Sequence, residues 1–253
     1  AALLAPLPAA YPPATTPEGF VAAIKLPEKE KIHSLAVSAD QKYLAVGCWG
    51  GSLRIYDFQT RKVVSEINET GGSIQCLDFH PEGKVLAIGT SVGDVLLWNV
   101  EGAKLIKKHT IKHPKSGKEG AICVLRFTPK GGGLIVGHHR SGTEGEWLLL
   151  DPELGKVIHR YDLGKSKPLH IEWLPDGKFL AASERFLHRF DQAKFEMSMN
   201  VGYGELRINC MGLSSDGKEY WVRGSNGQLA RYSLELGRRV GNVVEMKSPG
   251  AKE

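Results

Sequence analysis

The chain of 253 residues is long enough to bury a sizeable core, and 42% hydrophobic with 24% charged residues is ordinary for a globular protein. The 33 Lys and Arg residues exceed the 28 Asp and Glu residues by five, and no block of like charges stands out. This composition argues against disorder of the whole chain and gives no specific signal for nucleic acid. No apolar stretch approaches about 18 residues, so no membrane span is predicted.

Residues 1–17 are rich in Ala and Pro and contain no charged side chain, which is typical of a linker or leader. Such a segment would tether a further domain, or it would be the remnant of a secretory signal. A cytoplasmic location is expected for the chain, or export if residues 1–17 come from a signal peptide. Residues 18–26 are a strand candidate, and residues 247–253 are interpreted as a C-terminal tail.

One stretch, residues 74–109, shows the pattern that the rest of the chain repeats. It reads IQCLDFHPEGKVLAIGTSVGDVLLWNVEGAKLIKKH. Apolar runs at residues 74–79, 85–89, 95–98 and 103–106 are separated by turns rich in Gly, Pro and Asp. Short runs of Val, Ile, Leu and Trp between such turns indicate β-strands, so this stretch predicts four of them.

Five units share this pattern, each with one apolar anchor residue at the end of its first strand. The anchors are Val37, Phe79, Phe127, Trp173 and Leu213, at spacings of 42, 48, 46 and 40 residues. Two residues before the anchors stand Leu35, Leu77, Leu125, Ile171 and Met211. A repeat of about 40 to 50 residues with four strands is the signature of a β-propeller blade. The sequence therefore predicts an all-β protein, a β-propeller with at least five four-stranded antiparallel blades, over residues 18–246.

Two further features carry a resemblance to a known family. Turns such as HPEGK and PDGK accompany the anchors, and pairs such as Tyr56-Asp57 and Trp98-Asn99 close the third strands. These pairs resemble the Trp-Asp dipeptide of WD-repeat proteins. The resemblance implies a ring of blades around a channel, with the anchor-bearing strand innermost, and a usual role as a non-catalytic interaction platform.

The repeats also depart from the family pattern. No Gly-His pair precedes the inner strands, and Gly50, Val92 and Asn226 stand where the family usually has Asp. Functional residues of better-known members are therefore not carried over. The sequence also allows two ways in which the ring could close. Residues 18–26 would complete a blade formed by the other end of the chain, or they would be the outer strand of an upstream blade.

The repeat positions predict several side-chain environments. Cys76 and Cys210 both stand three residues before an anchor, which predicts small, buried thiols beside the channel, too far apart for a disulfide. Asp78 and Arg126 both stand one residue before an anchor, which predicts an ion pair between adjacent blades. The other two cysteines, Cys48 and Cys123, are likewise interpreted as buried free thiols.

The tryptophans divide into two groups. Trp147, Trp173 and Trp221 lie in strand runs and are expected in the core. Trp49 stands in a loop beside two glycines and is expected to be an exposed contact residue.

The third unit contains two insertions, at residues 107–120 and 138–146. In the geometry that the family implies, both lie on the same rim of the ring. The candidate partner-binding residues of this rim are Lys108, His109, Lys112, His113, Lys115, Lys118, His138, His139, Arg140 and Trp49.

Three interpretations of the two insertions stay open. A metal site would use their histidines with neighbouring carboxylates, although no fixed ligand spacing such as HExxH is present. An anion or acidic-peptide site would use the lysines and Arg140, since binding residues concentrate on loops of rigid scaffolds. The third interpretation is a solvated insertion that tolerates changes in length.

Enzyme motifs such as GxSxG, GxxxxGKS/T and GxGxxG after a strand are missing from the sequence, and no cofactor is predicted. We therefore predict a non-catalytic scaffold that binds a protein or peptide. One alternative is a propeller hydrolase or lyase with a channel site that uses His33, His170, Asp78 and Glu172. Another is a purely structural domain of a larger protein, because one fold hosts many functions.

Overall fold

The computed structural model describes residues 30–245, apart from residues 69, 115–116, 141–143, 154, 193, 204–206 and 226. These described residues form twenty strands in five four-stranded antiparallel sheets, named blades 1 to 5 in chain order. Blade 1 consists of β1 (Ile32–Val37), β2 (Tyr43–Cys48), β3 (Leu53–Asp57) and β4 (Val63–Ile67), and blade 2 of β5 (Ile74–Phe79), β6 (Val85–Thr90), β7 (Asp94–Asn99) and β8 (Lys104–Thr110). Blade 3 consists of β9 (Ala121–Phe127), β10 (Leu134–Arg140), β11 (Glu144–Asp151) and β12 (Lys156–Gly164). Blade 4 consists of β13 (Pro168–Trp173), β14 (Lys178–Ser183), β15 (Phe186–Asp191) and β16 (Met197–Gly202), and blade 5 of β17 (Ile208–Leu213), β18 (Glu219–Gly224), β19 (Gln228–Ser233) and β20 (Arg238–Glu245).

The register of the sheets confirms the repeat alignment. In every blade the strands pair in sequence order, and the anchor residue pairs with the beginning of the second strand. Phe79 faces Leu86, for example, and Leu213 faces Tyr220. Side chains alternate between the two faces of a strand. Because the register is shared, equivalent repeat positions lie on the same face in every blade.

The hydrophobic core lies between the blades. One cluster joins β2 and β3 of blade 1 to the inner strand of blade 2 through Ala45, Leu53, Ile55, Ile74 and Leu77. Equivalent clusters join blade 2 to blade 3, blade 3 to blade 4, and blade 4 to blade 5. Each blade is thus stabilised mainly by burial of apolar side chains against the next blade.

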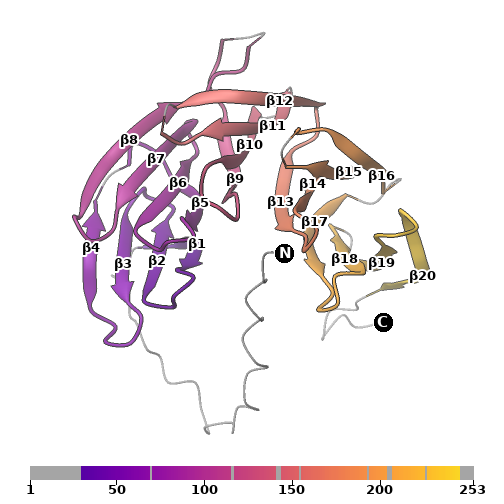
Figure 1. Cartoon of the computed structure of the whole chain (residues 1–253), viewed down its shortest axis with the longest axis horizontal. Coiled ribbons are helices and arrows are strands. Elements are labelled where there is room, and N and C mark those ends of the chain that lie inside the picture. Colours follow the sequence, from indigo (N-terminus) through magenta and orange to yellow (C-terminus); the bar gives the residue numbers. More distant parts are fainter. Residues whose placement is uncertain are drawn as a thin grey trace, which may run out of the picture.

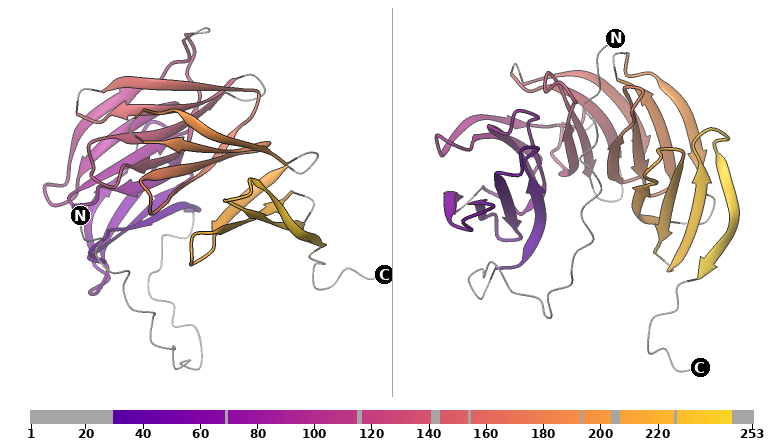
Figure 2. Two further views of the ribbon diagram at one scale, coloured as in Figure 1. Left: turned by 45° about the vertical axis from the view of Figure 1, so that its right-hand side comes forward. Right: turned by 60° about the horizontal axis from the view of Figure 1, so that its bottom comes forward.

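The five blades form an open arc (Figure 1; Figure 2), with the inner strands on its concave side. Within the described ranges, no core cluster connects blade 5 with blade 1. Residues 18–26, which the sequence predicts as a strand, lie outside the described residues.

The two free faces at the ends of the arc differ in character. On blade 1, Ile32, Leu35 and Val37 are exposed, although their repeat equivalents in blade 2 are buried. On blade 5, Arg231 forms an ion pair with Glu219 (3.6 Å between Nη1 and Oε2) and stacks over the ring of Trp221. One end of the arc is therefore apolar, while the other combines charged side chains with an exposed tryptophan.

The open arc also corrects two expectations about buried side chains. Cys210 and Trp221 are exposed, not buried, because they lie on blade 5, and among the described residues no further blade covers its outer face. Trp147 is fully buried and Trp173 is half-buried. Cys48 is buried, Cys76 and Cys123 are half-buried, and all four thiols are free. No helix in the described ranges has the length and apolar character needed to cross a membrane.

Candidate interaction rim and basic cleft

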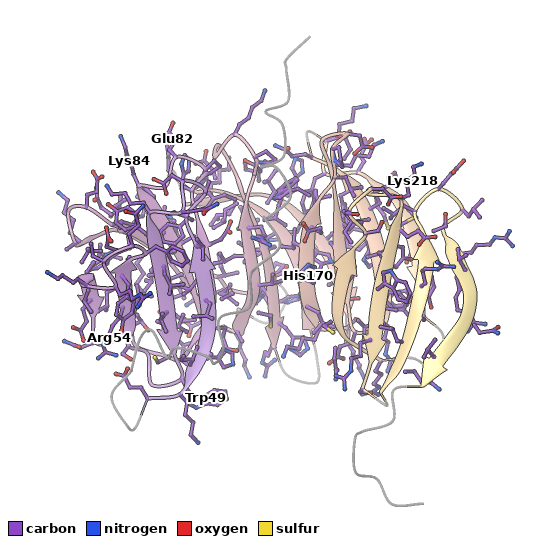
Figure 3. The ribbon with its side chains drawn as sticks, turned by 90° about the horizontal axis from the view of Figure 1, so that it is seen from below. Trp49, Arg54, Glu82, Lys84, His170 and Lys218 are labelled. Atoms are coloured by element: carbon purple, nitrogen blue, oxygen red, sulfur yellow. The ribbon has the colours of Figure 1, made fainter. Side chains whose placement is uncertain are left out.

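One rim of the arc is formed by the hairpins between second and third strands together with the connections that enter the inner strands. A repeated backbone hydrogen bond holds the two together. The amide of Trp49 donates to the carbonyl of Lys31 at 2.9 Å, and the amide of Glu184 donates to the carbonyl of Lys167 at 3.0 Å. Figure 3 shows Trp49 at this rim, while Glu82, Lys84 and Lys218, from hairpins between first and second strands, lie at the opposite rim. We name the two sides the Trp49 rim and the Lys84 rim.

The first insertion folds back on itself. Strand β8 continues to Thr110, so the loop itself begins only after this residue. Lys112 and Glu119 then form an isolated bridge, and the amide of His113 donates to the carbonyl of Lys118 at 3.0 Å. Lys115 lies outside the described residues.

Three candidate residues of this insertion do not present free side chains at the rim. Lys108 is paired with Asp94 on the outer part of blade 2, with 2.7 Å between Nζ and Oδ2. The Nε2 of His109 lies 3.4 Å from the carbonyl oxygen of Pro152, in the turn between β11 and β12. His113 is buried. The structure therefore does not gather these three side chains at one surface. Lys108 and His109 contact other strands and turns of the blades, and His113 is buried.

The second insertion is anchored by a buried charged network, and this corrects the placement of His138. His138 is fully buried, and its Nδ1 lies 2.9 Å from Oε1 of Glu146. Arg160 of β12 donates to both carboxylate oxygens of Glu146 at 2.8 and 2.7 Å. Burial alone would raise the pKa of Glu146, but the bonds from His138 and Arg160 hold it below its usual value. The network has a structural role: it fixes the β10–β11 hairpin against the outer strand.

A cleft of about 730 Å³ opens where the remaining residues of the rim meet. It is lined by Gln75, Ser91, Glu119, Gly120, Ala121, Cys123, His139, Arg140, Lys165, Lys167, Glu184, Arg185 and Arg207. Four blades contribute to it, from blade 2 to blade 5. Five of the lining residues are Lys or Arg and two are Glu, so we name it the basic cleft.

Four of the five cations of the basic cleft have no ion pair with a carboxylate among the described residues. In the described part of the chain, no ion pair joins Lys165, Lys167, Arg185 or Arg207 to a carboxylate. Their charge is felt by a neighbour, since partial burial and the nearby Lys167 both lower the pKa of His139. The five cations of the cleft outnumber its two glutamates, so the cleft carries an excess of positive charge.

Of the sequence-predicted rim residues, only His139 and Arg140 line the cleft. Lys165, Lys167, Arg185 and Arg207 were missed because they stand in short connections that look unremarkable one at a time. The repeat alignment contains the signal, since Lys167 and Arg207 both stand immediately before an inner strand. Trp49 lies on the same rim with 60% of its surface exposed, and its ring contacts His33 edge-on.

The inner strands carry paired charges. Arg126 donates to Asp78 at 3.1 Å, which confirms the predicted ion pair between adjacent blades. The same carboxylate accepts the amide of Phe127 at 2.7 Å. His170 lies 3.2 Å from Glu172, and this bond lowers the pKa of the Glu172 carboxyl. Both channel carboxylates are thus engaged in holding neighbouring groups.

Two family models match parts of the chain. Residues 23–57 match the family described as WD domain, G-beta repeat, and residues 66–124 match the anaphase-promoting complex subunit 4 WD40 domain. Over these two segments the chain is similar to WD repeats. Echinoderm microtubule-associated protein-like 4 from Homo sapiens is among the similar proteins, with 33% identity over 111 residues, or 43% of this chain and 10% of that protein.

A further curated protein and a solved structure are also similar to this chain. Telomerase protein component 1 from Rattus norvegicus is 31% identical over 154 residues, which cover 61% of this chain and 6% of that protein. A chain of the crystal structure of the mitotic checkpoint complex superimposes with a TM-score of 0.74 at 16% identity, over 89% of this chain and 68% of that chain. The chain thus has a β-propeller fold. Its matches span about a tenth or less of the two curated relatives.

Proposed function

We propose that this WD-repeat chain is a non-catalytic scaffold that binds a protein or peptide through its Trp49 rim. The observation that carries the proposal is the basic cleft, where connections from four blades converge on one surface. A rigid arc of antiparallel sheets holds such loops at fixed relative positions, which suits recognition of an extended partner.

The chemistry of the channel supports a scaffold over a hydrolase or lyase. Asp78 and Glu172, the carboxylates that a channel site would use, are bonded to Arg126 and His170. In the described ranges, no three His, Cys, Asp or Glu side chains are grouped so as to hold a metal ion. The names of the similar proteins also describe association, with microtubules in one case and in a checkpoint complex in the other.

Photo-crosslinking from the two rims tests the proposal. A benzoylphenylalanine residue is introduced at Trp49 or Lys165 on one rim, and at Lys84 or Lys218 on the other, all of them exposed positions. After irradiation in cell extract, we expect the Trp49 and Lys165 variants to give adducts with a shared protein that mass spectrometry identifies. Equal adducts from both rims, or adducts from the Lys84 rim alone, would contradict a partner site at the Trp49 rim.

A further inference from the structure

We infer that the basic cleft recognises an acidic segment of the partner protein. This inference rests on the proposed function and adds the chemical class of the ligand. The cations come from three blades: Arg140 from blade 3, Lys165, Lys167 and Arg185 from blade 4, and Arg207 from blade 5. They therefore surround the cleft instead of following one strand, and an extended chain that crosses it meets positive charge from several sides.

Convergence in one hollow, and not the lack of ion pairs alone, sets this cluster apart, since other described cations such as Lys104 and Arg223 also have no ion pair. Some cations on the flanks of the blades have carboxylate partners, as with Lys108 and Asp94 at 2.7 Å or Arg54 and Glu66 at 2.9 Å. Lys165, Lys167, Arg185 and Arg207 have none among the described residues. Like charges that converge without partners repel one another, and an anionic ligand relieves that repulsion while it gains charge-assisted hydrogen bonds.

The other lining groups favour a peptide over a nucleic acid. Binding of single-stranded nucleic acid relies on aromatic platforms for the bases, whereas His139 is the only aromatic ring among the residues lining the cleft. Gln75 and Ser91 supply neutral donors and acceptors that suit a peptide backbone. The volume of about 730 Å³ lies within the usual range of ligand sites.

Fluorescence anisotropy with defined probes tests the inference. The probes are fluorescein-labelled octaglutamate, octaglutamine and an oligothymidylate of similar length, each titrated with the whole chain. We expect octaglutamate to bind at least about tenfold more tightly than octaglutamine. Its affinity should fall as the salt concentration rises from about 0.05 to about 0.3 M, because the contacts are exposed and screened.

A matched pair of variants distinguishes the effect of the cleft cations on binding from the effect of the net charge of the chain. Arg185→Glu with Arg207→Glu alters the cleft, while Lys84→Glu with Lys218→Glu makes the same change in net charge on the opposite rim. All four side chains are exposed, so both variants should fold, and circular dichroism confirms this. We expect the cleft variant to weaken octaglutamate binding about tenfold or more and the control variant to change it less than about twofold.

Several outcomes would overturn the inference: no binding of octaglutamate, equal binding of octaglutamine, tighter binding of the oligothymidylate, or equal losses in the two variants. The crosslinking experiment distinguishes its failure from that of the proposed function. If octaglutamate does not bind but Lys165 still gives a specific adduct, the acidic-ligand inference fails and the scaffold function stands. If both results are negative, both proposals fail.

Discussion

Gly47 of blade 1 packs directly against Ile74 of blade 2, so closely that a Cβ atom on Gly47 would stand 2.5 Å from Cγ2 of the isoleucine. The same relationship recurs between Gly89 and Ile122, at 2.6 Å. An isoleucine at the start of one inner strand thus fills the space that a glycine leaves in the preceding blade.

Substitution of Gly47 by Ala should destabilise the chain by about 1 to 3 kcal/mol, because the added methyl group overpacks the interface between blades 1 and 2. Urea unfolding measures the change. Gly212→Ala is the control, since a Cβ there meets no atom within 4 Å. Equal effects of the two substitutions would show that the blade interface is not the cause.

Truncation of Trp98 to Ala should cost about 3 to 5 kcal/mol. The Trp98 side chain is buried between blades 1 and 2, and its Nε1 donates to Oγ of Ser65 in blade 1 at 2.9 Å. Trp49→Ala, at the exposed rim, should cost less than about 0.5 kcal/mol. A loss under about 1 kcal/mol for Trp98→Ala in denaturant melts would contradict the assigned register.

The exposed end of the arc predicts different consequences for two equivalent leucines. Leu77 is 7% exposed and Leu35 is 59% exposed, although both stand two residues before an anchor. Leu77→Ala should therefore cost about 2 to 5 kcal/mol, and Leu35→Ala less than about 1 kcal/mol. Thermal melts of the two variants measure both, and a large loss for Leu35→Ala would mean that this face is covered in solution.

His188 predicts a loss of stability in mild acid. Burial lowers the pKa of His188 to about 4, and its ring lies among Tyr161, Phe186 and Phe190. Below about pH 6.5 the unfolded chain binds a proton that the folded chain does not bind until about pH 4. The free energy of unfolding therefore falls as the pH drops through this window.

Replacement of His188 by Phe should remove this dependence, because Phe suits the aromatic surroundings and cannot be protonated. Between about pH 7 and about pH 4.5, the wild type should lose about 2 kcal/mol more than the variant. Urea unfolding at both pH values measures the difference. Parallel losses in the two proteins would show that another group causes the acid sensitivity.

The free thiols should react at very different rates. Cys210 is exposed on blade 5, while Cys48 is buried. Burial raises the pKa of Cys123 to about 11 and that of Cys76 well above its usual value, so little reactive thiolate forms at neutral pH. We expect one fast-labelling thiol per native chain, which the Cys210→Ser substitution removes. Fast labelling that persists in this variant would contradict the assignment.

The sequence by itself determined the strands, their grouping into blades and the shared register. The repeated anchors and turns specify these features locally, because hydrophobic alternation and turn chemistry act over a few residues. The Asp78–Arg126 pair and the exposure of Trp49 were predictable for the same reason, since both follow from repeat position or loop composition.

Only the tertiary structure decided where the end faces and the basic cleft lie. The exposure of Cys210 and Trp221 depends on whether another blade follows, which no local pattern encodes. His138 lies in an insertion full of polar residues, yet its side chain is buried against Glu146. Lys167, Arg185 and Arg207 are separated in the chain and meet only because the blades curve around a common axis. Long-range packing between blades therefore brings the cations of the cleft together, whereas local sequence patterns determine the strands next to which they lie.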